Sequence, residues 1–207
     1  DAQESRGLGD VYKRQVIDQC ILLALCLNIH NTQPSHGLTS EQMSAFVERV
    51  IQHPLNWSVH TMSLLLRSRL EASRTRTVER STLQLQALID QMPTNDSSVR
   101  ERLRFFHALE LPAKWAMQSE LAHRYVSIGV LRSALETFER VEMWENVVQC
   151  LGLLGRQQEG IEVVRDLLEG RKTEAEAQLQ AKRIARAREA KLWCLLGDLE
   201  PMHAEMH

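Results

Sequence analysis

The stretch "HRYVSIGVLRSALETF", residues 123–138, places two aromatic residues, a glycine and an alanine at spacings of four, five and four. These residues are Tyr125, Gly129, Ala134 and Phe138. A glycine lets the backbone turn, a small residue lets two helices approach closely, and larger apolar side chains fill the seam between the helices. The stretch therefore predicts two antiparallel helices joined by a tight turn at Gly129.

The spacing continues outward from this stretch and predicts a helical repeat. It follows the tetratricopeptide pattern, in which a large and a small residue precede the tyrosine. The first unit matches at Leu121, Ala122, Tyr125, Gly129, Ala134, Leu135 and Phe138, with Gln118 in place of the usual tryptophan. The second unit matches at Trp144, Val147, Val148, Leu151, Gly155, Gly160, Ile161 and Val164, and a third begins with Trp193, Leu196 and Gly197.

Two features of the repeats are irregular. Gly155 follows Gly129 by 26 residues, whereas the usual period is about 34. A charged stretch, residues 169–191, separates the second unit from the third, and its composition predicts a solvated helix. An ordinary amphipathic hairpin is the alternative interpretation of the first unit. A second unit in phase with it favours the repeat, because each hairpin must stack on another to cover its apolar face.

The rest of the chain also predicts helices. Aromatic residues make up only 5% of the 207 residues, and no segment alternates like a strand. Thr39 with Gln42 predicts a capping box, and the apolar residues 20–29, too few to cross a bilayer, predict a buried helix. We expect an all-α, helical-hairpin solenoid in three parts. They are a non-native or disordered terminus (1–15), a non-canonical helical region stacked on the repeats (16–111), and the repeats with the insert (112–207).

Charge and cysteine usage restrict the function classes. The formal net charge of −2 argues against a dedicated binder of nucleic acid or anionic membranes. The four cysteines are scattered without a metal or redox spacing, which favours a reducing, intracellular setting. Among the eight histidines, only His203 and His207 are four apart, and two ligands do not make a zinc site. No phosphate loop or nucleophile motif is present, so we expect no catalysis, cofactor or metal.

The first helix of each repeat lines the concave face of such solenoids and predicts a partner-binding surface. On this register the surface consists of Ser119, His123, Ser127, Glu142, Glu145, Asn146 and Gln149. It is polar and partly acidic, so it should suit a basic or neutral peptide in the groove. Of the five cationic and amide residues that clamp acidic EEVD tails in some tetratricopeptide proteins, only Asn146 and Lys191 have counterparts here. We therefore expect no direct binding of such tails.

Three blocks of the chain, residues 37–92, 112–155 and 192–198, resemble the tetratricopeptide repeat protein 27 family. The likeness includes the non-repeat segment "LLLRSRLE" (64–71) as well as "LWCLLGD" (192–198). The chains of this family are longer, so we expect this chain to be an internal piece. The family's linker is shorter than the insert found here. The resemblance implies an intracellular, non-enzymatic scaffold for assembling large complexes with chaperone machinery, spliceosomal particles included, in the cytoplasm and the nucleus.

A basic cluster supports a second hypothesis from another class. It consists of Arg67, Arg69, Arg74, Arg76 and Arg80. Such a cluster is usually a solvated face, but it would also suit an acidic partner or RNA. No aromatic residue interleaves with it, which argues against stacking on single-stranded RNA. We therefore favour a protein-interaction scaffold, with an RNA-associated factor as the alternative and no role at a membrane.

Overall fold

The chain folds as α-helices joined by turns, as the composition predicted. The computed structural model describes residues 16–34, 36–109, 111–172 and 182–199, and within these ranges it contains ten helices and no strand. Contacts divide the chain into two compact units, one ending at Lys114 and the other beginning at Trp115. Each unit is described by itself. The all-α class and its antiparallel hairpins are confirmed.

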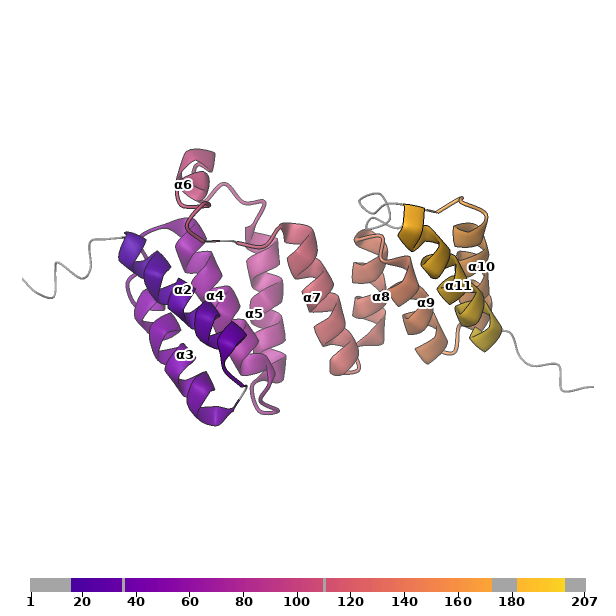
Figure 1. Cartoon of the computed structure of the whole chain (residues 1–207), viewed down its shortest axis with the longest axis horizontal. Helices are drawn as coiled ribbons and strands as arrows, with labels where there is room; N and C mark the ends of the chain where they lie inside the picture. Colours follow the sequence, from indigo (N-terminus) through magenta and orange to yellow (C-terminus); the bar gives the residue numbers. More distant parts are fainter. Residues whose placement is uncertain (1–15, 35, 110, 173–181, 200–207) are drawn as a thin grey trace, which may run out of the picture. The chain divides into compact units, whose positions relative to one another are not determined.

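The first unit is a sequence of hairpins in which each helix packs on the next. Its helices are α2 (Val16–Thr32), α3 (Gly37–Ile51), α4 (Trp57–Ala72), α5 (Val78–Gln91) and the short α6 (Val99–Leu103). Helix α3 packs against α2 and α4, and α4 also packs against α5 (Figure 1). Leu23, Val47, Leu65 and Leu85, one from each of the four long helices, are fully buried. Their burial is the main source of this unit's stability.

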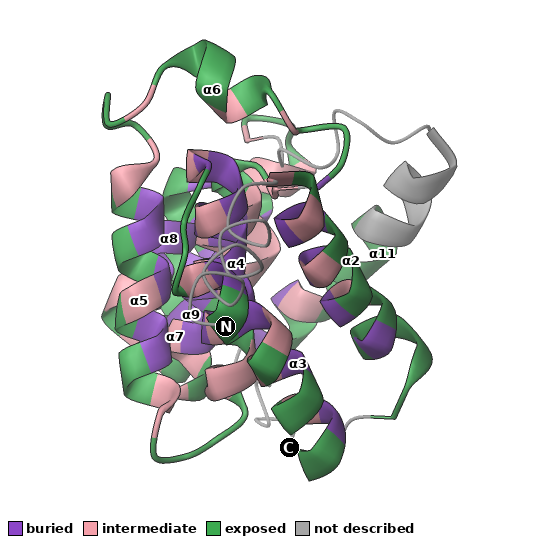
Figure 2. Ribbon diagram, turned by 90° about the vertical axis from the view of Figure 1, so that its left-hand side faces the viewer, coloured by how far each residue is buried: buried purple, intermediate pink, exposed green. Residues whose placement is uncertain are grey.

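Helix α2 is buried on one side only. Leu23 and Cys26 are completely buried, whereas Ile17 and Ile21 are 58% and 52% exposed. Both buried and exposed residues therefore appear along this helix (Figure 2). The sequence predicted that the helix over residues 20–29 is buried, but only one side of it is buried and the other side is exposed. An unbroken apolar run carries no periodicity that tells one side of a helix from the other.

Helix α3 begins before the predicted capping box. The cap is His36, whose side-chain Nδ1 accepts a hydrogen bond from the Thr39 backbone N–H at 3.3 Å. Thr39 is buried, and its hydroxyl donates to the Pro34 carbonyl at 3.3 Å. The capping role predicted for Thr39 was therefore wrong. A histidine nitrogen can also accept a capping hydrogen bond, and His36 lies one turn before Thr39.

The second unit contains α7 (Lys114–Ser127), α8 (Leu131–Arg140), α9 (Trp144–Leu153), α10 (Gln157–Leu168) and α11 (Lys182–Leu199). Helix α9 packs between α8 and α10, and α10 packs on α11. One apolar cluster joins α7, α8 and α9, and it includes Ala122, Ala134, Phe138 and Val147. A second cluster joins α9, α10 and α11 through Val148, Ile161, Val164, Leu196 and Leu199. The hairpins therefore share continuous cores.

Four consecutive helices of the second unit end in the same turn. The second residue after each helix has a positive φ, which is 82° at Gly129, 59° at Glu142, 73° at Gly155 and 72° at Gly170. The next residue's N–H then bonds back to a carbonyl five residues earlier, as from Val130 to Tyr125 at 2.9 Å. This pattern satisfies the last carbonyls of each helix. It sets the sharp reversals that stack α7 to α10.

The charged insert is only partly described. Residues 173–181 lie outside the described residues, as do His203, His207 and residues 1–15. Residues 182–191 form the first half of α11, which continues without a break into the segment that contains Trp193. This helix brings Lys191 to the side of α9.

Candidate functional site

The predicted partner-binding residues of α7 lie along one side of that helix. Ser119, His123 and Ser127 are four residues apart, which places them on one face. His123 and Ser127 are exposed, and Ser119 is half-buried. The His123 ring also packs edge-on against Phe138 of α8, with ring centroids 5.1 Å apart. His123 therefore both presents a polar edge and stabilises its own hairpin.

The predicted residues near α9 have three different environments. Gln149 is exposed and Asn146 is half-buried on the helix. Glu142 lies outside the helix, exposed in the turn that precedes α9. Glu145 forms an ion pair with Lys191 of α11, and its side chain is only 14% exposed. The pair cancels one negative charge, so this surface is less acidic than the sequence predicted.

A cation–aromatic contact lies beside this ion pair. The ammonium of Lys172 stands 4.6 Å from the centre of the Trp144 ring at the start of α9. The same ammonium lies 3.5 Å from the Asp166 carboxylate of α10. Trp144 is therefore half-buried by the turn that follows α10. The exposed polar face of α9 is limited to the positions around Asn146 and Gln149.

The repeat-defining residues divide between close packing and open surface. Leu121, Ala122, Ala134 and Phe138 are buried. Gly160 is also buried, and a Cβ added there would meet Leu199 Cδ1 at 3.2 Å, so α10 and α11 approach closely at this point.

Other members of that set are less enclosed. Tyr125 is half-buried. Trp193 is 57% exposed, and Gly197 is exposed with no atom within 4 Å of where a Cβ would be. Helix α11 packs instead through Leu196 and Leu199.

The basic cluster does not form a continuous cationic face. Arg67 and Arg80 both pair with the Glu71 carboxylate, at 3.0 and 2.8 Å. Burial by itself raises the pKa of Glu71, but hydrogen bonds and charge from Arg80 and Arg67 outweigh it and hold the pKa below its usual value. Arg76 lies exposed between α4 and α5. The remaining two arginines lie elsewhere, at a pocket.

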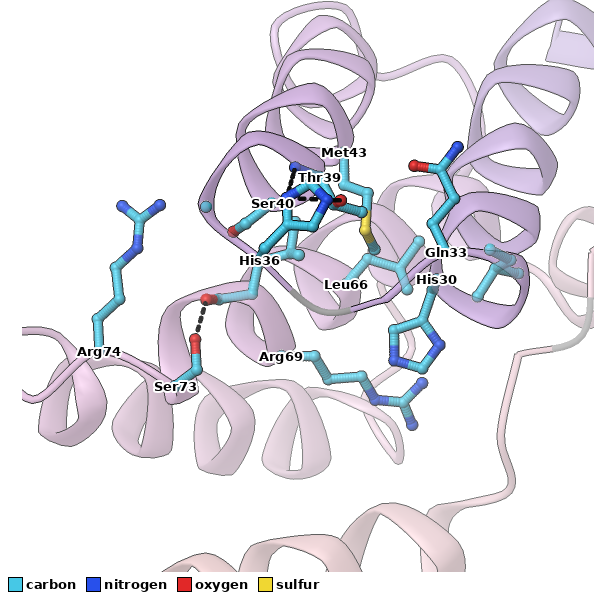
Figure 3. Close-up of a pocket in the computed structure, with 13 residues that line it drawn as sticks. His30, Gln33, His36, Thr39, Ser40, Met43, Leu66, Arg69, Ser73 and Arg74 are labelled. Carbon is cyan, nitrogen blue, oxygen red and sulfur yellow. Dashed lines mark hydrogen bonds between the residues drawn. The ribbon is translucent and has the colours of Figure 1, made fainter.

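This pocket, the α2–α4 pocket, lies among α2, α3 and α4 and was not predicted from the sequence. Its volume is about 410 Å³, and Arg69 and Arg74 of the basic cluster line it. Figure 3 shows Arg69 reaching past the start of α3 toward His30 at the end of α2. The lining comes from three separate segments of the chain, so no single motif could have indicated it.

Three of the cysteines are buried, and their thiols are poor nucleophiles. Burial raises the pKa of the Cys20, Cys26 and Cys150 thiols, that of Cys26 to about 11, which disfavours the reactive thiolate. Within the described ranges, no three metal-binding side chains gather in one place. No helix in these ranges has the length and apolar character needed to cross a membrane.

Comparison with known proteins finds several relatives that match most of this chain, and three of them are described here. A TPR repeat-containing protein of Schizosaccharomyces pombe is 42% identical over 188 residues, covering 76% of this chain and 23% of the relative. A tetratricopeptide repeat protein 27 homolog of Dictyostelium discoideum is 36% identical over 184 residues, covering 89% and 20%. The "Essential for maintenance of the cell wall protein 1" of Saccharomyces cerevisiae is 28% identical over 173 residues, covering 77% and 19%.

No family model and no solved structure matches the chain. The identities of 36% and 42% extend across both units, beyond the repeat pattern alone. The chain spans about a fifth of the length of these curated relatives. Its tetratricopeptide hairpins and this similarity agree, and the chain belongs to the tetratricopeptide repeat protein 27 family.

Proposed function

We propose that this chain is a binding segment of a non-enzymatic scaffold, and that the exposed polar face of α7 and α9 contacts a protein partner. The observation that carries the proposal is that His123, Ser127 and Gln149 remain exposed on the first helices of stacked hairpins whose other sides are buried. Short polar side chains held on rigid helices provide hydrogen bonds at little cost in conformational entropy.

The chemistry of this face favours a partner segment that is neutral or basic. Asn146 and Gln149 each offer an amide that both donates and accepts hydrogen bonds. Glu142 adds one exposed carboxylate, while Lys191 neutralises Glu145. A basic residue in the partner would therefore meet Glu142, and the rest of the contact would depend on hydrogen bonds.

The wider role that we propose follows from the family resemblance. It is the assembly of large complexes with chaperone machinery, spliceosomal particles included, in the cytoplasm and nucleus. The names of the relatives describe tetratricopeptide proteins and, in Saccharomyces cerevisiae, a protein essential for cell-wall maintenance. Assembly scaffolds act through many partners, so the partners recovered from cells test this part of the proposal.

The test is affinity capture of the full-length protein from cell lysate, with protein and RNA identified together. The test variant combines Asn146→Arg and Gln149→Arg, which crowd the α9 face and reverse its preference for basic partners. The matched control combines Gln157→Arg and Gln158→Arg, two exposed amides at the start of α10. We expect the test variant to lose specific protein partners that the control retains.

Equal recovery of partners by both variants would contradict the proposed binding face. The RNA alternative is less favoured, because two of the five arginines are occupied by Glu71. Salt-sensitive recovery of RNA that is lost when the five arginines are changed to Gln, with protein partners unaffected, would replace the scaffold proposal with the RNA one.

A further inference from the structure

The segment that contains α6, residues 97–109, exposes three large apolar side chains. Helix α6 packs against α4 of the first unit, and it stands beyond the start of α4 (Figure 1) with most of its surface exposed (Figure 2). The side chains are those of Val99, Leu103 and Phe106, which are 71%, 56% and 69% exposed. We call these three residues the α6 strip. Large apolar side chains that gather on a surface mark an interaction site.

The members of the α6 strip lie on one face of the segment. Helix α6 covers Val99–Leu103, and its turns continue, because the Phe106 N–H donates to the Leu103 carbonyl at 3.4 Å. The three residues are four and three positions apart, which is the spacing of neighbours along one helical face. Phe105 and Leu109 occupy another side of the same turns, where Leu109 is buried and Phe105 is half-buried. The segment therefore has an inner side and an exposed apolar side.

The α6 segment is fixed to the start of α4 by side-chain contacts. The Asn56 side-chain amide donates to the Glu101 carbonyl at 3.1 Å, and the Ser58 hydroxyl donates to the Arg102 carbonyl at 2.6 Å. The Arg102 guanidinium lies 4.0 Å from the centre of the Trp57 ring and donates to two backbone carbonyls before α6. The strip is thus held in place before a partner arrives, which lowers the entropy lost on binding.

Two arginines border the α6 strip. Residues 97–109 contain three arginines and one acidic residue, Glu101. Arg100 precedes Leu103 by three residues and Arg104 by four, and both are exposed along one edge of the strip. Among the residues that the structure describes, no carboxylate pairs with Arg100 or Arg104, and the Arg104 guanidinium lies 5.4 Å from the centre of the Phe105 ring. Both charges are therefore available to a carboxylate from outside.

An apolar strip bordered by two cations suits an amphipathic helix whose apolar side is bordered by acids. Guanidinium groups bind carboxylates with two parallel hydrogen bonds. Single-stranded RNA suits the strip less well, because Val99 and Leu103 are aliphatic and offer no ring on which a base can stack. A lipid surface requires a larger apolar area or more basic residues than this segment provides.

We propose that the α6 segment is a second docking surface, which binds an acidic amphipathic helix of a protein partner. The apolar side of that helix lies on Val99, Leu103 and Phe106, and its carboxylates pair with Arg100 and Arg104. A contact of this size belongs to the weak and transient class of interfaces. It uses residues of the first unit only, so it is separate from the α7 and α9 face.

The test is fluorescence anisotropy of the full-length protein with labelled peptides of about 18 residues, long enough to form a helix in water. The first peptide, the Glu peptide, has Leu on one helical face and Glu beside it. The second, the Lys peptide, has Lys in place of Glu, and the third has Ser in place of Leu. We expect the Glu peptide to bind below about 1 mM and the other two to bind at least about tenfold more weakly.

Reversal of the charges beside the strip is the sharpest variant. Arg100→Glu/Arg104→Glu should weaken binding of the Glu peptide by at least about tenfold and strengthen binding of the Lys peptide. A merely adhesive apolar surface would bind both peptides as before. The matched control is Arg76→Glu, which changes an exposed arginine between α4 and α5 and should leave binding of the Glu peptide unchanged.

Removal of the apolar side chains tests the other half of the contact. Leu103→Ser/Phe106→Ser should weaken binding of the Glu peptide by at least about tenfold. The matched control is Leu83→Ser, because Leu83 of α5 is 65% exposed and lies outside the strip. All of these substitutions replace exposed side chains, and circular dichroism checks that each variant remains folded.

A second measurement locates the contact in cells. A photo-reactive phenylalanine analogue replaces Phe106 in the full-length protein, and mass spectrometry identifies the crosslinked peptides. We expect crosslinks to a segment of another protein that has apolar residues at helical intervals with Asp or Glu beside them. These crosslinks should disappear when Arg100→Glu/Arg104→Glu is added.

Several outcomes would overturn the proposal. They are equal binding of the Glu and Lys peptides, binding of the Glu peptide that survives either double variant, and no binding below about 1 mM. Crosslinks from position 106 to another segment of the same chain would assign the strip to internal packing. Displacement of the Glu peptide by a single-stranded RNA, or tighter binding to vesicles of phosphatidylserine and phosphatidylcholine, would overturn the choice of a protein partner. None of these outcomes bears on the α7 and α9 face, so the two proposals fail independently.

Discussion

Glu142 has a backbone conformation that glycine adopts at three equivalent turns. Its φ is 59°, and Gly129, Gly155 and Gly170 have φ between 72° and 82°. A left-handed conformation costs a residue with a Cβ about 1–2 kcal/mol, and glycine avoids most of this cost. The strain at Glu142 coincides with its place at the edge of the proposed binding face. An exposed carboxylate at this turn is consistent with a role in binding.

Glu142→Gly should therefore stabilise the protein by about 0.5–1 kcal/mol. The substitution relieves the backbone strain, but glycine also makes the unfolded chain more flexible, which offsets part of the gain. Gly129→Ala should destabilise the protein by about 1 kcal/mol. A Cβ at this position meets no atom within 4 Å, so the loss of stability would come from the backbone conformation and not from a steric clash. Urea unfolding measures both. A destabilising Glu142→Gly would show that the carboxylate makes a contact that outweighs the strain.

Glu71 links stability to pH. Its pKa is lowered in the folded state by Arg80 and Arg67, against the raising effect of burial. A carboxyl group whose pKa is lower in the folded state than in the unfolded state stabilises the fold at pH values above its unfolded-state pKa. This stabilisation disappears as the pH falls through its folded-state pKa. The free energy of unfolding of the wild type should therefore exceed that of Glu71→Gln by about 1 kcal/mol at pH 7. The two free energies should converge in acid. Chemical unfolding between about pH 7 and 3 tests this, and a gap that widens in acid would exclude the mechanism.

At the scale of elements, α2 shows how packing assigns a direction to an apolar helix. Helix α2 packs against α3 and α4. Leu23 of α2 is fully buried, whereas Ile21, two residues away, is 52% exposed. Similar apolar side chains therefore contribute differently to stability, depending on whether they lie on the buried or the exposed side of the helix.

Leu23→Ala should destabilise the protein by about 2–5 kcal/mol, because it leaves a cavity in the core of the first unit. Ile21→Ala, on the exposed side of the same helix, should change the free energy of unfolding by no more than about 0.5 kcal/mol. Thermal or urea unfolding of the two variants is the measurement. Comparable losses would mean that the outer side of α2 is covered in the protein in solution.

At the scale of the whole molecule, charge pairing determines which partners the surfaces suit. Lys191 stands at the α9 face but is paired with Glu145, so it adds no net positive charge there. Two arginines of the basic cluster, Arg69 and Arg74, line the α2–α4 pocket of the first unit.

An EEVD-ending peptide should show no binding to the full chain at micromolar concentration in calorimetry, because the α7 and α9 face lacks an available cationic clamp. Lys191→Ala should leave this result unchanged, since the ammonium is already paired with Glu145. Micromolar binding that is lost in Lys191→Ala would show that the ion pair opens for an acidic tail. Such binding would also reverse the charge preference proposed for this face.

The sequence by itself determined the helical class, the antiparallel hairpins and the family. Local spacing carries these properties: Gly129 and Gly155 mark turns, and apolar residues at helical intervals mark the seams. The family became evident because identity to the relatives extends over most of the chain.

Only the tertiary structure decided which side of α2 is buried, where the cap of α3 lies, and which charges are paired. Glu145 and Lys191 are 46 residues apart, and Arg80 reaches Glu71 across a turn. The α2–α4 pocket likewise exists only because three helices bring His30, His36 and Arg69 together. Contacts between distant segments depend on how helices pack, and spacing along one helix cannot encode them.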